Sequence, residues 1–470
     1  MKNEQNISRR KFLKAIGIGG AVTVAALTGC KNKKAEEISD EYVNQVEPLK
    51  GKMTYREDQK THKKISLLGY GMMRLPTVKE KQGDEEKDVI DQETVNRLVD
   101  YAIEHGVNYF DTSPAYCQGM SERSTGDALH KYPRESYFVA TKLSNFNETQ
   151  WTREESIKMY NNSFHELQVD YIDYYLLHAI GGGGLENFNG RYVDNGMLDF
   201  LMEERNKGKI RHLGFSFHGD KEMFDFLMSK HDVYQWDFVQ IQLNYLDWDY
   251  AGQGNTDARY LYDELQKRNI PAVIMEPLLS GRLAKVPQFI TREMKKMAPE
   301  RSVASWAFRY AGSPDGVLTV LSGMTYMEHL KDNLLSFCPL EPVTDKEKEF
   351  LYEMARKIVG VETIPCNDCN YCMPCPYGVN IPAIFVHYNK FKNEGILPND
   401  VQSEDFESNK RKYLISLDRT VPRERQASHC IGCGQCEPHC PQNIRIHREL
   451  QRIDEFVEKL KQNTLDDLGA

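Results

Sequence analysis

The sequence lacks the features that define several large classes of protein. It has no basic excess, because 60 lysines and arginines stand against 69 aspartates and glutamates, which gives a formal net charge of -9. Nucleic-acid-binding domains are usually basic, so no DNA or RNA partner is expected. No apolar run reaches the roughly 20 residues that a membrane-spanning helix needs. A Gly-rich dinucleotide fingerprint after a first strand is also missing.

The composition that remains is that of an ordinary folded protein with more than one domain. Hydrophobic residues make up 40% and charged residues 27% of the chain, which argues against disorder. A length of 470 residues exceeds what one hydrophobic core usually serves. We expect a signal at 1–30, a charged tether without a core of its own at 31–60, a large domain at 61–340 and a small domain at 341–470.

The first thirty residues have the pattern of an export signal. Ser8-Arg9-Arg10-Lys11-Phe12-Leu13-Lys14 precedes a weakly apolar run, as in twin-arginine signals, which carry folded proteins. The run ends at Cys30 in a sequence that resembles a lipobox. The sequence thus predicts twin-arginine export and a lipid anchor on Cys30, on the periplasmic or cell-surface side of a membrane. A plain membrane anchor is the alternative, although Gly17 and Gly19 interrupt the short run.

Eight of the eleven cysteines fall into two tight runs near the C-terminus. The second run, with spacings of two, two and three residues and a following proline, matches the bacterial ferredoxin pattern for a [4Fe-4S] cluster, in which the last cysteine often serves the other cluster. The first run is one residue shorter at its last gap, so its fourth ligand stays open. Zinc is the alternative, but zinc sites generally use separated cysteine pairs. The predicted ligands are Cys366, Cys369, Cys372, Cys375, Cys430, Cys433, Cys436 and Cys440.

These two runs resemble a ferredoxin-type module, and the resemblance implies two [4Fe-4S] clusters that exchange electrons with a redox partner protein. Purely structural clusters are the other possibility. Between the runs, residues 379–393 have helical spacing and residues 395–420 have the composition of a polar insertion. Cys117 and Cys338 lie outside the runs and are expected to be packed thiols.

The middle of the chain alternates short apolar runs with amphipathic stretches. Eight such units over roughly 270 residues match a closed (β/α)8 barrel better than an open doubly wound sheet, which usually carries the missing fingerprint. The predicted strands are 66–71, 107–112, 136–142, 171–178, 210–216, 238–244, 272–276 and 317–322, and the clearest helices are 91–105, 153–167, 197–207, 260–268 and 302–310.

Four polar residues stand at or just after predicted strand ends, where barrels carry their chemistry: Asp111, Tyr116, Lys142 and His178. A tyrosine with a pKa of about 10 is a poor acid near neutrality unless an ammonium stabilises its phenolate. Lys142 could supply that charge, held by Asp111. His178 could align a carbonyl oxygen for protonation. The set indicates carbonyl reduction by hydride.

Four motifs in the same region resemble those of the aldo/keto reductase superfamily. They are Phe110-Asp111-Thr112-Ser113-Pro114-Ala115-Tyr116, Ala140-Thr141-Lys142, Leu176-Leu177-His178 and Gly208-Lys209-Ile210-Arg211-His212-Leu213-Gly214-Phe215-Ser216. The resemblance runs from about residue 63 to 340 and implies that Tyr116 is the general acid, tuned by Lys142 and Asp111, while His178 orients the substrate. It also implies hydride transfer between NADP or NAD and a small carbonyl or alcohol, with sugars among the candidates.

The same resemblance implies where the dinucleotide binds. Departures include Phe217, where many relatives have asparagine, and Met275, where many have tyrosine; no Lys or Arg directly follows Ser322 to hold a 2′-phosphate, so NADP is only modestly preferred. Ordinary turns are the alternative explanation of these loops. The predicted cofactor contacts are Ser216, Gln242, Pro277, Leu278, Ser280, Gly281, Ser322, Gly323, Met324, His329 and Asn333.

Two functions from different classes remain open. One is a reductase whose clusters pass single electrons, although free NAD(P)H should be scarce outside the cytoplasm and no flavin motif is present to convert two-electron into one-electron steps. The other is an exported electron-transfer or sensor subunit with a non-catalytic barrel. The complete set of Asp111, Tyr116, Lys142 and His178 favours the enzyme.

Overall fold

The structure is a computed structural model that describes residues 46–82, 85–252, 254–361 and 363–465. The predicted export signal and Cys30 lie outside these residues. Among the helices in the described ranges, none has the length and apolar character needed to cross a membrane.

Eight parallel strands close into a barrel, as the sequence predicts. The order around the barrel is β10-β11-β12-β3-β6-β7-β8-β9, so each strand pairs with its neighbours in the chain and the last pairs with the first. Nearly all positions of these strands are buried, on both faces of the sheet, and this explains why the strands are continuous apolar runs in the sequence. The strands are β3 (Leu68–Gly71), β6 (Tyr109–Asp111), β7 (Phe138–Leu143), β8 (Ile172–Ile180), β9 (Ile210–Phe217), β10 (Phe238–Gln242), β11 (Ala272–Met275) and β12 (Val317–Ser322).

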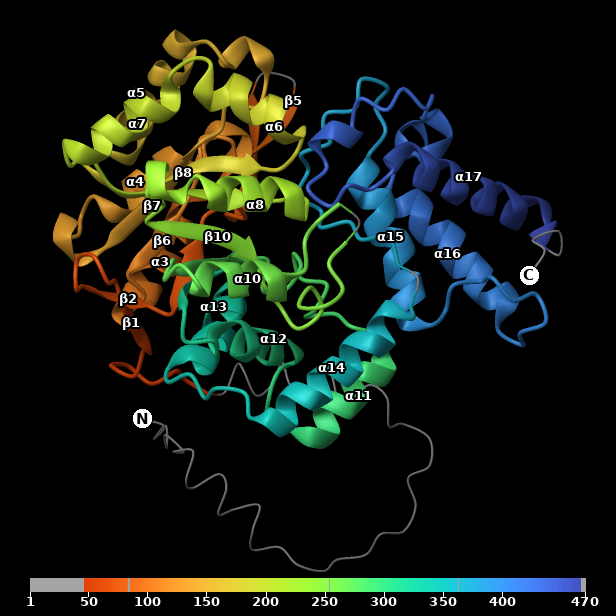
Figure 1. Cartoon of the computed structure of the whole chain (residues 1–470). Helices are drawn as coiled ribbons and strands as arrows, with labels where there is room; N and C mark the ends of the chain where they lie inside the picture. The colour runs from red at the N-terminus through yellow and green to blue at the C-terminus, as the bar shows by residue number, and fades with distance from the viewer. Residues whose placement is uncertain (1–45, 83–84, 253, 362, 466–470) are drawn as a thin grey trace, which may run out of the picture.

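Helices cover the outside of the barrel (Figure 1). Their starts follow sequence signals: Asp91 caps the first of them by accepting a hydrogen bond from the Thr94 amide, and Thr152 caps α5 through the Glu155 amide. The main covering helices are α3 (Gln92–Glu104), α4 (Ser121–Leu129), α5 (Arg153–Leu167), α7 (Met197–Asn206), α8 (Lys221–Ser229), α10 (Ala258–Gln266), α11 (Gln288–Met297), α12 (Val303–Gly312) and α13 (Met327–Phe337). A hairpin of β4 (Thr77–Gln82) and β5 (Glu85–Ile90) follows the first barrel strand.

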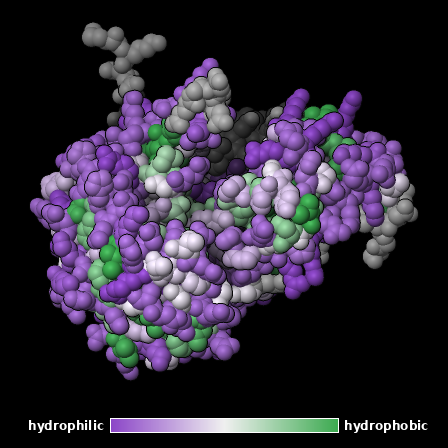
Figure 2. Space-filling model, turned by 90° about the horizontal axis from the view of Figure 1, so that it is seen from above, coloured by the Kyte–Doolittle hydropathy of each residue, from purple (hydrophilic) through white to green (hydrophobic). Residues whose placement is uncertain are grey.

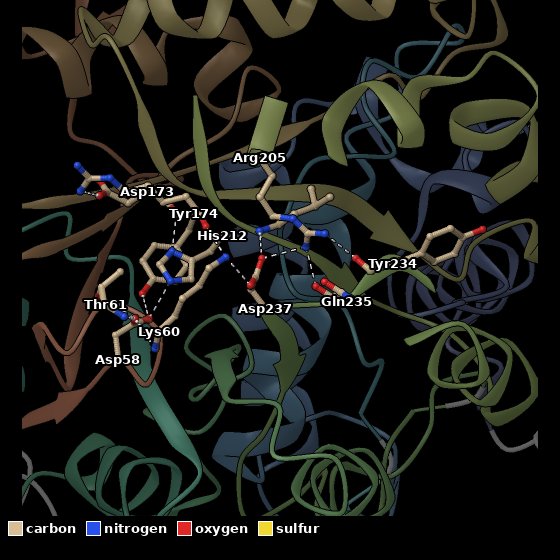
Figure 3. Close-up of polar contacts among 12 residues, drawn as sticks. Asp58, Lys60, Thr61, Asp173, Tyr174, Arg205, His212, Tyr234, Gln235 and Asp237 are labelled. Atoms are coloured by element: carbon tan, nitrogen blue, oxygen red, sulfur yellow. Dashed lines mark hydrogen bonds and ion pairs between the residues drawn. The ribbon is translucent and has the colours of Figure 1, made fainter. Parts of the chain in front are cut away.

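The N-terminal end of the barrel is closed by a hairpin of β1 (Tyr55–Glu57) and β2 (Lys64–Ser66). The buried Asp58 carboxylate accepts hydrogen bonds from the Thr61 hydroxyl and the Tyr174 hydroxyl, at 2.7 Å each, and lies 3.1 Å from His212 Nε2 (Figure 3). Residues 53–60 therefore differ from the expected tether without a core, because Met53 and Asp58 are buried against the barrel.

A second hydrophobic core follows the barrel. It holds α15 (Ile381–Glu394), α16 (Phe406–Thr420) and α17 (Ile446–Gln462), drawn in blue to the right of the barrel in Figure 1. The stretch expected as a polar insertion contains α16, because Tyr413 and Leu417 are buried in this core while the rest of the helix is mostly solvated.

The barrel core continues beyond residue 340. Helix α14 (Asp345–Val359) starts with a capping box between Thr344 and Glu347, and it buries Leu351 and Met354 in the barrel core. The second core begins at Ile364. The polypeptide therefore leaves the barrel only a few residues before the first cysteine run.

The surface is largely hydrophilic on the face that Figure 2 shows, and hydrophobic residues appear on it in scattered places. Scattered apolar side chains are normal on soluble surfaces. The fold thus consists of a closed barrel and a helical domain that carries both cysteine runs.

Candidate functional site

The four predicted catalytic side chains meet at the C-terminal end of the barrel. Asp111 ends β6, Lys142 lies near the end of β7, and His178 lies near the end of β8. Tyr116 begins the short turn after β6, where Cys117 and Gln118 take positive φ angles of 49° and 56°. Four residues separate Asp111 from Tyr116 along the chain.

Lys142 and Asp111 form a buried ion pair. Lys142 Nζ donates to Asp111 Oδ1 at 2.5 Å and to the Thr112 carbonyl at 2.8 Å, and their side chains are 0% and 3% exposed. Burial lowers the pKa of Lys142, while the charge and the hydrogen bond of Asp111 raise it. Asp111 is therefore the group that keeps the lysine protonated.

Tyr116 faces the ammonium of Lys142, whose Nζ lies 4.8 Å from the centre of the phenol ring. Because an ammonium stabilises a phenolate, the sequence predicts that this charge lowers the pKa of Tyr116. The pKa of Tyr116 is instead raised well above its usual value, chiefly by burial, and the neighbouring Tyr371 and Asp111 raise it further. The hydroxyl of the free protein is thus held protonated, as a proton donor requires.

His178 is held by two serines that the sequence argument did not single out. Its Nδ1 lies 2.6 Å from Ser144 Oγ and 3.3 Å from Ser113 Oγ, and these two oxygens are 2.8 Å apart. Ser113 Oγ also accepts from the Ala115 amide at 3.1 Å. A chain of donors from Ala115 through Ser113 and Ser144 to Nδ1 would satisfy both hydroxyls, and in that arrangement the ring proton is on Nε2.

The environment of His178 keeps the imidazole neutral. Burial lowers its pKa well below the ordinary value, and the positive charges of Lys142 and Arg191 add to that shift. The ring of Tyr116 stands edge-on to the His178 ring at 5.7 Å between centres. A neutral Nε2–H beside the tyrosine can donate a hydrogen bond to the same oxygen that Tyr116 protonates.

A cavity of about 730 Å³ opens at this end of the barrel, and all four catalytic candidates line it. That volume lies in the range of small-molecule and cofactor sites. Nine of the predicted cofactor contacts also line it: Ser216, Pro277, Leu278, Ser280, Gly281, Ser322, Gly323, His329 and Asn333. Gln242 and Met324 are not among the lining residues.

The two exceptions have a simple structural origin. Strand β10 presents Gln240 to the cavity, two positions before Gln242, whose Oε1 instead lies 2.9 Å from Nδ1 of His218. Met324 is buried, and its carbonyl accepts a hydrogen bond from the Tyr70 hydroxyl at 2.6 Å. The candidate amide contact at the cavity wall is therefore Gln240.

The polar groups of the cavity fit a nicotinamide dinucleotide. Gln240 Oε1 is buried without a hydrogen-bond partner, and such a group needs a ligand donor. Ser216 Oγ accepts from the Ala179 amide at 2.8 Å, which leaves its own proton free to donate. Arg74 and Lys285 add positive charge to the lining. An amide contact, a hydroxyl donor and two cations are what a carboxamide and a pyrophosphate require.

The helical domain supplies part of the same cavity wall. Asn367, Cys369, Tyr371 and Pro441 line it together with the barrel residues. These residues lie in or next to the two predicted cysteine runs. The sequence analysis predicted cavity residues only from the barrel strands and their loops. The one sequence signal that could have indicated Tyr371 is its position between two predicted cluster ligands.

None of the eight predicted cluster cysteines, all of which lie in the described residues, forms a disulfide. Cys366, Cys369, Cys372 and Cys440 together line one small apolar cavity. The pKa of each of the first three thiols is raised, mainly by burial and in part by neighbouring Cys440. Within the described part of the chain, no three His, Cys, Asp or Glu side chains converge closely enough for a single metal ion.

The cysteines that line this small cavity indicate which residue is the fourth ligand beside the first three cysteines of the first run. Cys440, from the second run, joins the first three cysteines of the first run, as in the ferredoxin pattern where the last cysteine serves the other cluster. Cys430 and Cys433 influence the thiol of Cys436. Cys375 is the one cysteine of the two runs that neither group includes. The first group supplies the four thiols that a [4Fe-4S] cluster needs.

Comparisons with known proteins agree with this two-part organisation. The aldo/keto reductase family profile matches residues 67–349, and a 4Fe-4S dicluster domain matches residues 365–445. L-galactose dehydrogenase of Arabidopsis thaliana is 23% identical over 317 residues, which cover 64% of this chain and 93% of that protein. The uncharacterized oxidoreductase YqkF of Bacillus subtilis is 24% identical over 301 residues, covering 57% and 86%.

Solved structures support the same barrel fold. The holo form of the aldo-keto reductase AKR11C1 from Bacillus halodurans superposes with a TM-score of 0.51 at 22% identity, covering 64% of this chain and 96% of that chain. The thermostable aldo-keto reductase Tm1743 also has a TM-score of 0.51, at 21% identity, and covers 64% and 100%.

Proposed function

Because the chain belongs to the aldo/keto reductase family, we propose that it interconverts a carbonyl and an alcohol with NADP or NAD in the cavity of about 730 Å³. The observation that carries the proposal is the convergence of Tyr116, Lys142, Asp111 and His178 on that cavity. A binding platform would have no use for a buried ion pair beneath a protonated phenol.

In this proposal each side chain has a defined task. Tyr116 donates its proton to the carbonyl oxygen, and it takes the proton back in the reverse direction. His178 donates from Nε2 to the same oxygen and so fixes its position, while Asp111 keeps Lys142 charged. The ammonium then stabilises the phenolate that forms when the proton leaves. The dinucleotide, when bound, supplies or accepts the hydride.

Residues around the cavity would hold the dinucleotide at both ends. Ser216 and Gln240 are placed for the carboxamide, and Gly281 and Gly323 line the part of the wall where Lys285 and Arg74 add positive charge. Gly281 has a φ of 95° and leaves open space where a side chain would stand. Direct titration with each dinucleotide decides between NADP and NAD.

A sugar or another small polyol is the proposed substrate class. L-galactose dehydrogenase and D-arabinose 1-dehydrogenase of Saccharomyces cerevisiae are among the similar proteins, the latter 29% identical over 181 residues. Their names describe oxidation of sugars. Support also comes from a cavity whose lining mixes hydroxyl, amide and charged groups.

The two thiol sets would hold [4Fe-4S] clusters that exchange single electrons with a redox partner. The 4Fe-4S dicluster match over residues 365–445 supports this part of the proposal. Cys440→Ser is expected to remove the cluster nearest the cavity, and Cys375→Ser the other one. Each variant should then lose about half of the iron and sulfide of the wild type, as measured after anaerobic purification.

We also propose that the protein is exported by the twin-arginine route and anchored by a lipid on Cys30. Ser8-Arg9-Arg10 and the sequence before Cys30 support this location. Replacement of Arg9 and Arg10 by lysine should leave the folded protein in the cytoplasm, and Cys30→Ser should release it from the membrane fraction. A wild-type protein recovered without lipid from the cytoplasm would contradict this part.

The test of the proposed function is a combined analysis of the anaerobically purified chain from Cys30 onward. Released small molecules are analysed for NADP and NAD, alongside the iron and sulfide count. Bound dinucleotide with about eight irons supports a reductase with two clusters. Iron without dinucleotide, and no binding on titration, would leave an electron-transfer protein on a non-catalytic barrel.

A further inference from the structure

The cavity wall that comes from the helical domain has no counterpart in a barrel alone. Two barrel side chains fasten it through three hydrogen bonds. Arg74 donates to the Asn367 carbonyl at 2.7 Å and to the Asp368 carbonyl at 3.3 Å. Asn255 donates to the Pro441 carbonyl at 3.1 Å. The loop that carries Cys366 and Cys369 is thus fixed against the barrel mouth.

Tyr371 is the side chain of this loop that reaches the reacting groups. It lines the same cavity as Tyr116 and His178. Its ring lies 6.1 Å from that of Phe146, which in turn lies 4.9 Å from the His178 ring. Tyr371 therefore shares the cavity wall with both groups that hold the substrate oxygen, and it comes from a different domain.

The position suggests a task that neither Tyr116 nor His178 can perform. Both of these side chains are committed to the reacting oxygen. A second hydroxyl on the wall of the same cavity can bind an oxygen on the carbon next to the carbonyl, because neighbouring oxygens of a small polyol are about one hydrogen-bond length apart. A substrate with a single oxygen would leave the Tyr371 hydroxyl without that contact, and buried polar groups without partners are costly.

We propose that Tyr371 is a substrate-positioning residue, supplied by the first cysteine run, that selects carbonyl substrates with a hydroxyl on the adjacent carbon. This inference rests on the proposed carbonyl chemistry and narrows its substrate class. It also ties the pocket to the helical domain, since Tyr371 lies between the predicted cluster ligands Cys369 and Cys372.

The test compares matched substrates in the wild-type holoprotein and in Tyr371→Phe. The pairs are glyceraldehyde with propanal and hydroxyacetone with acetone, each with NADPH and with NADH. The wild type should prefer the hydroxylated member in kcat/KM. Tyr371→Phe should lower that preference on the order of tenfold, mainly through KM, and should leave the other member nearly unchanged.

Structural damage would lower kcat/KM equally for both substrates of a pair. The ratio of the two kcat/KM values therefore isolates the positioning role. Tyr377→Phe is the matched control, because Tyr377 lies two residues after the same run but is 47% exposed. An unchanged ratio in Tyr371→Phe, with an active wild type, would overturn this inference alone. A wild type that binds neither dinucleotide and reduces none of the four compounds would overturn the proposed function and this inference together.

Discussion

Removing one member of the Lys142–Asp111 pair should cost more stability than removing both. The pair is fully buried, and Asp111 Oδ2 has no hydrogen-bond partner. Burial raises the pKa of Asp111 and lowers that of Lys142. At neutral pH the folded protein keeps both groups charged, although burial favours the neutral form of each. This cost offsets the attraction between the two charges, so the pair itself contributes little stability.

The expected magnitudes follow from this burial. Asp111→Asn leaves an uncompensated ammonium and should lower the free energy of unfolding of the barrel by about 3–5 kcal/mol. The double variant Asp111→Leu with Lys142→Met removes both charges at similar volume, and it should lie within about 1.5 kcal/mol of the wild type. Both variants should lose at least about a hundredfold in kcat/KM, because the proton donor loses its tuning charge.

Urea unfolding followed by tryptophan fluorescence measures this directly. All four tryptophans, Trp151, Trp236, Trp248 and Trp306, belong to the barrel, so the signal reports barrel unfolding. Carbonyl reduction by the same samples gives the activity. A double variant as unstable as Asp111→Asn, or one that keeps wild-type turnover, would refute the view that this pair serves chemistry at the expense of stability.

Three further predictions concern groups other than the Lys142–Asp111 pair. Ser144→Ala should lower kcat/KM about tenfold without weakening dinucleotide binding. It should also shift the His178 proton away from Nε2, which nitrogen NMR can detect. An unchanged tautomer would contradict the hydrogen-bond chain through Ser144. Asp58→Asn should cost the barrel about 3 kcal/mol, whereas exposed Glu57→Gln should change little. Because its partners depress the pKa of Asp58, that difference should shrink as the pH falls below about 4, and a pH-independent difference would contradict it. Chelation of iron should lower carbonyl reduction while tryptophan fluorescence stays native, since the loop with Tyr371 loses its support; full activity without iron would argue against a shared pocket.

The barrel could be predicted from the sequence because its signals are local and repeated. Every one of the eight predicted strands belongs to the closed sheet, with ends shifted by a few residues. Apolar runs such as β8 are buried on both faces, so their composition alone identifies them. The four catalytic candidates were predictable because strand ends of a barrel meet at one face.

The rest depends on contacts between distant segments. Nothing local in the sequence shows that Arg74 binds the carbonyl of Asn367, or that Tyr371 lines the same cavity as Tyr116. The pKa of Tyr116 was expected to fall, but burial, which a sequence does not display, raises it. Gln240 lines the cavity whereas Gln242 pairs with His218, and that difference depends on contacts between strands that the sequence does not show.

The central claim is that hydride passes between a dinucleotide and a carbonyl carbon beside Tyr116. The most direct measurement uses NADPH or NADH deuterated at the transferable position, with glyceraldehyde, and analyses the alcohol by mass spectrometry. The wild type should give an alcohol one mass unit heavier, and Tyr116→Phe should bind the dinucleotide equally but form almost no product. An alcohol without deuterium, or a Tyr116→Phe variant as fast as the wild type, would contradict the account.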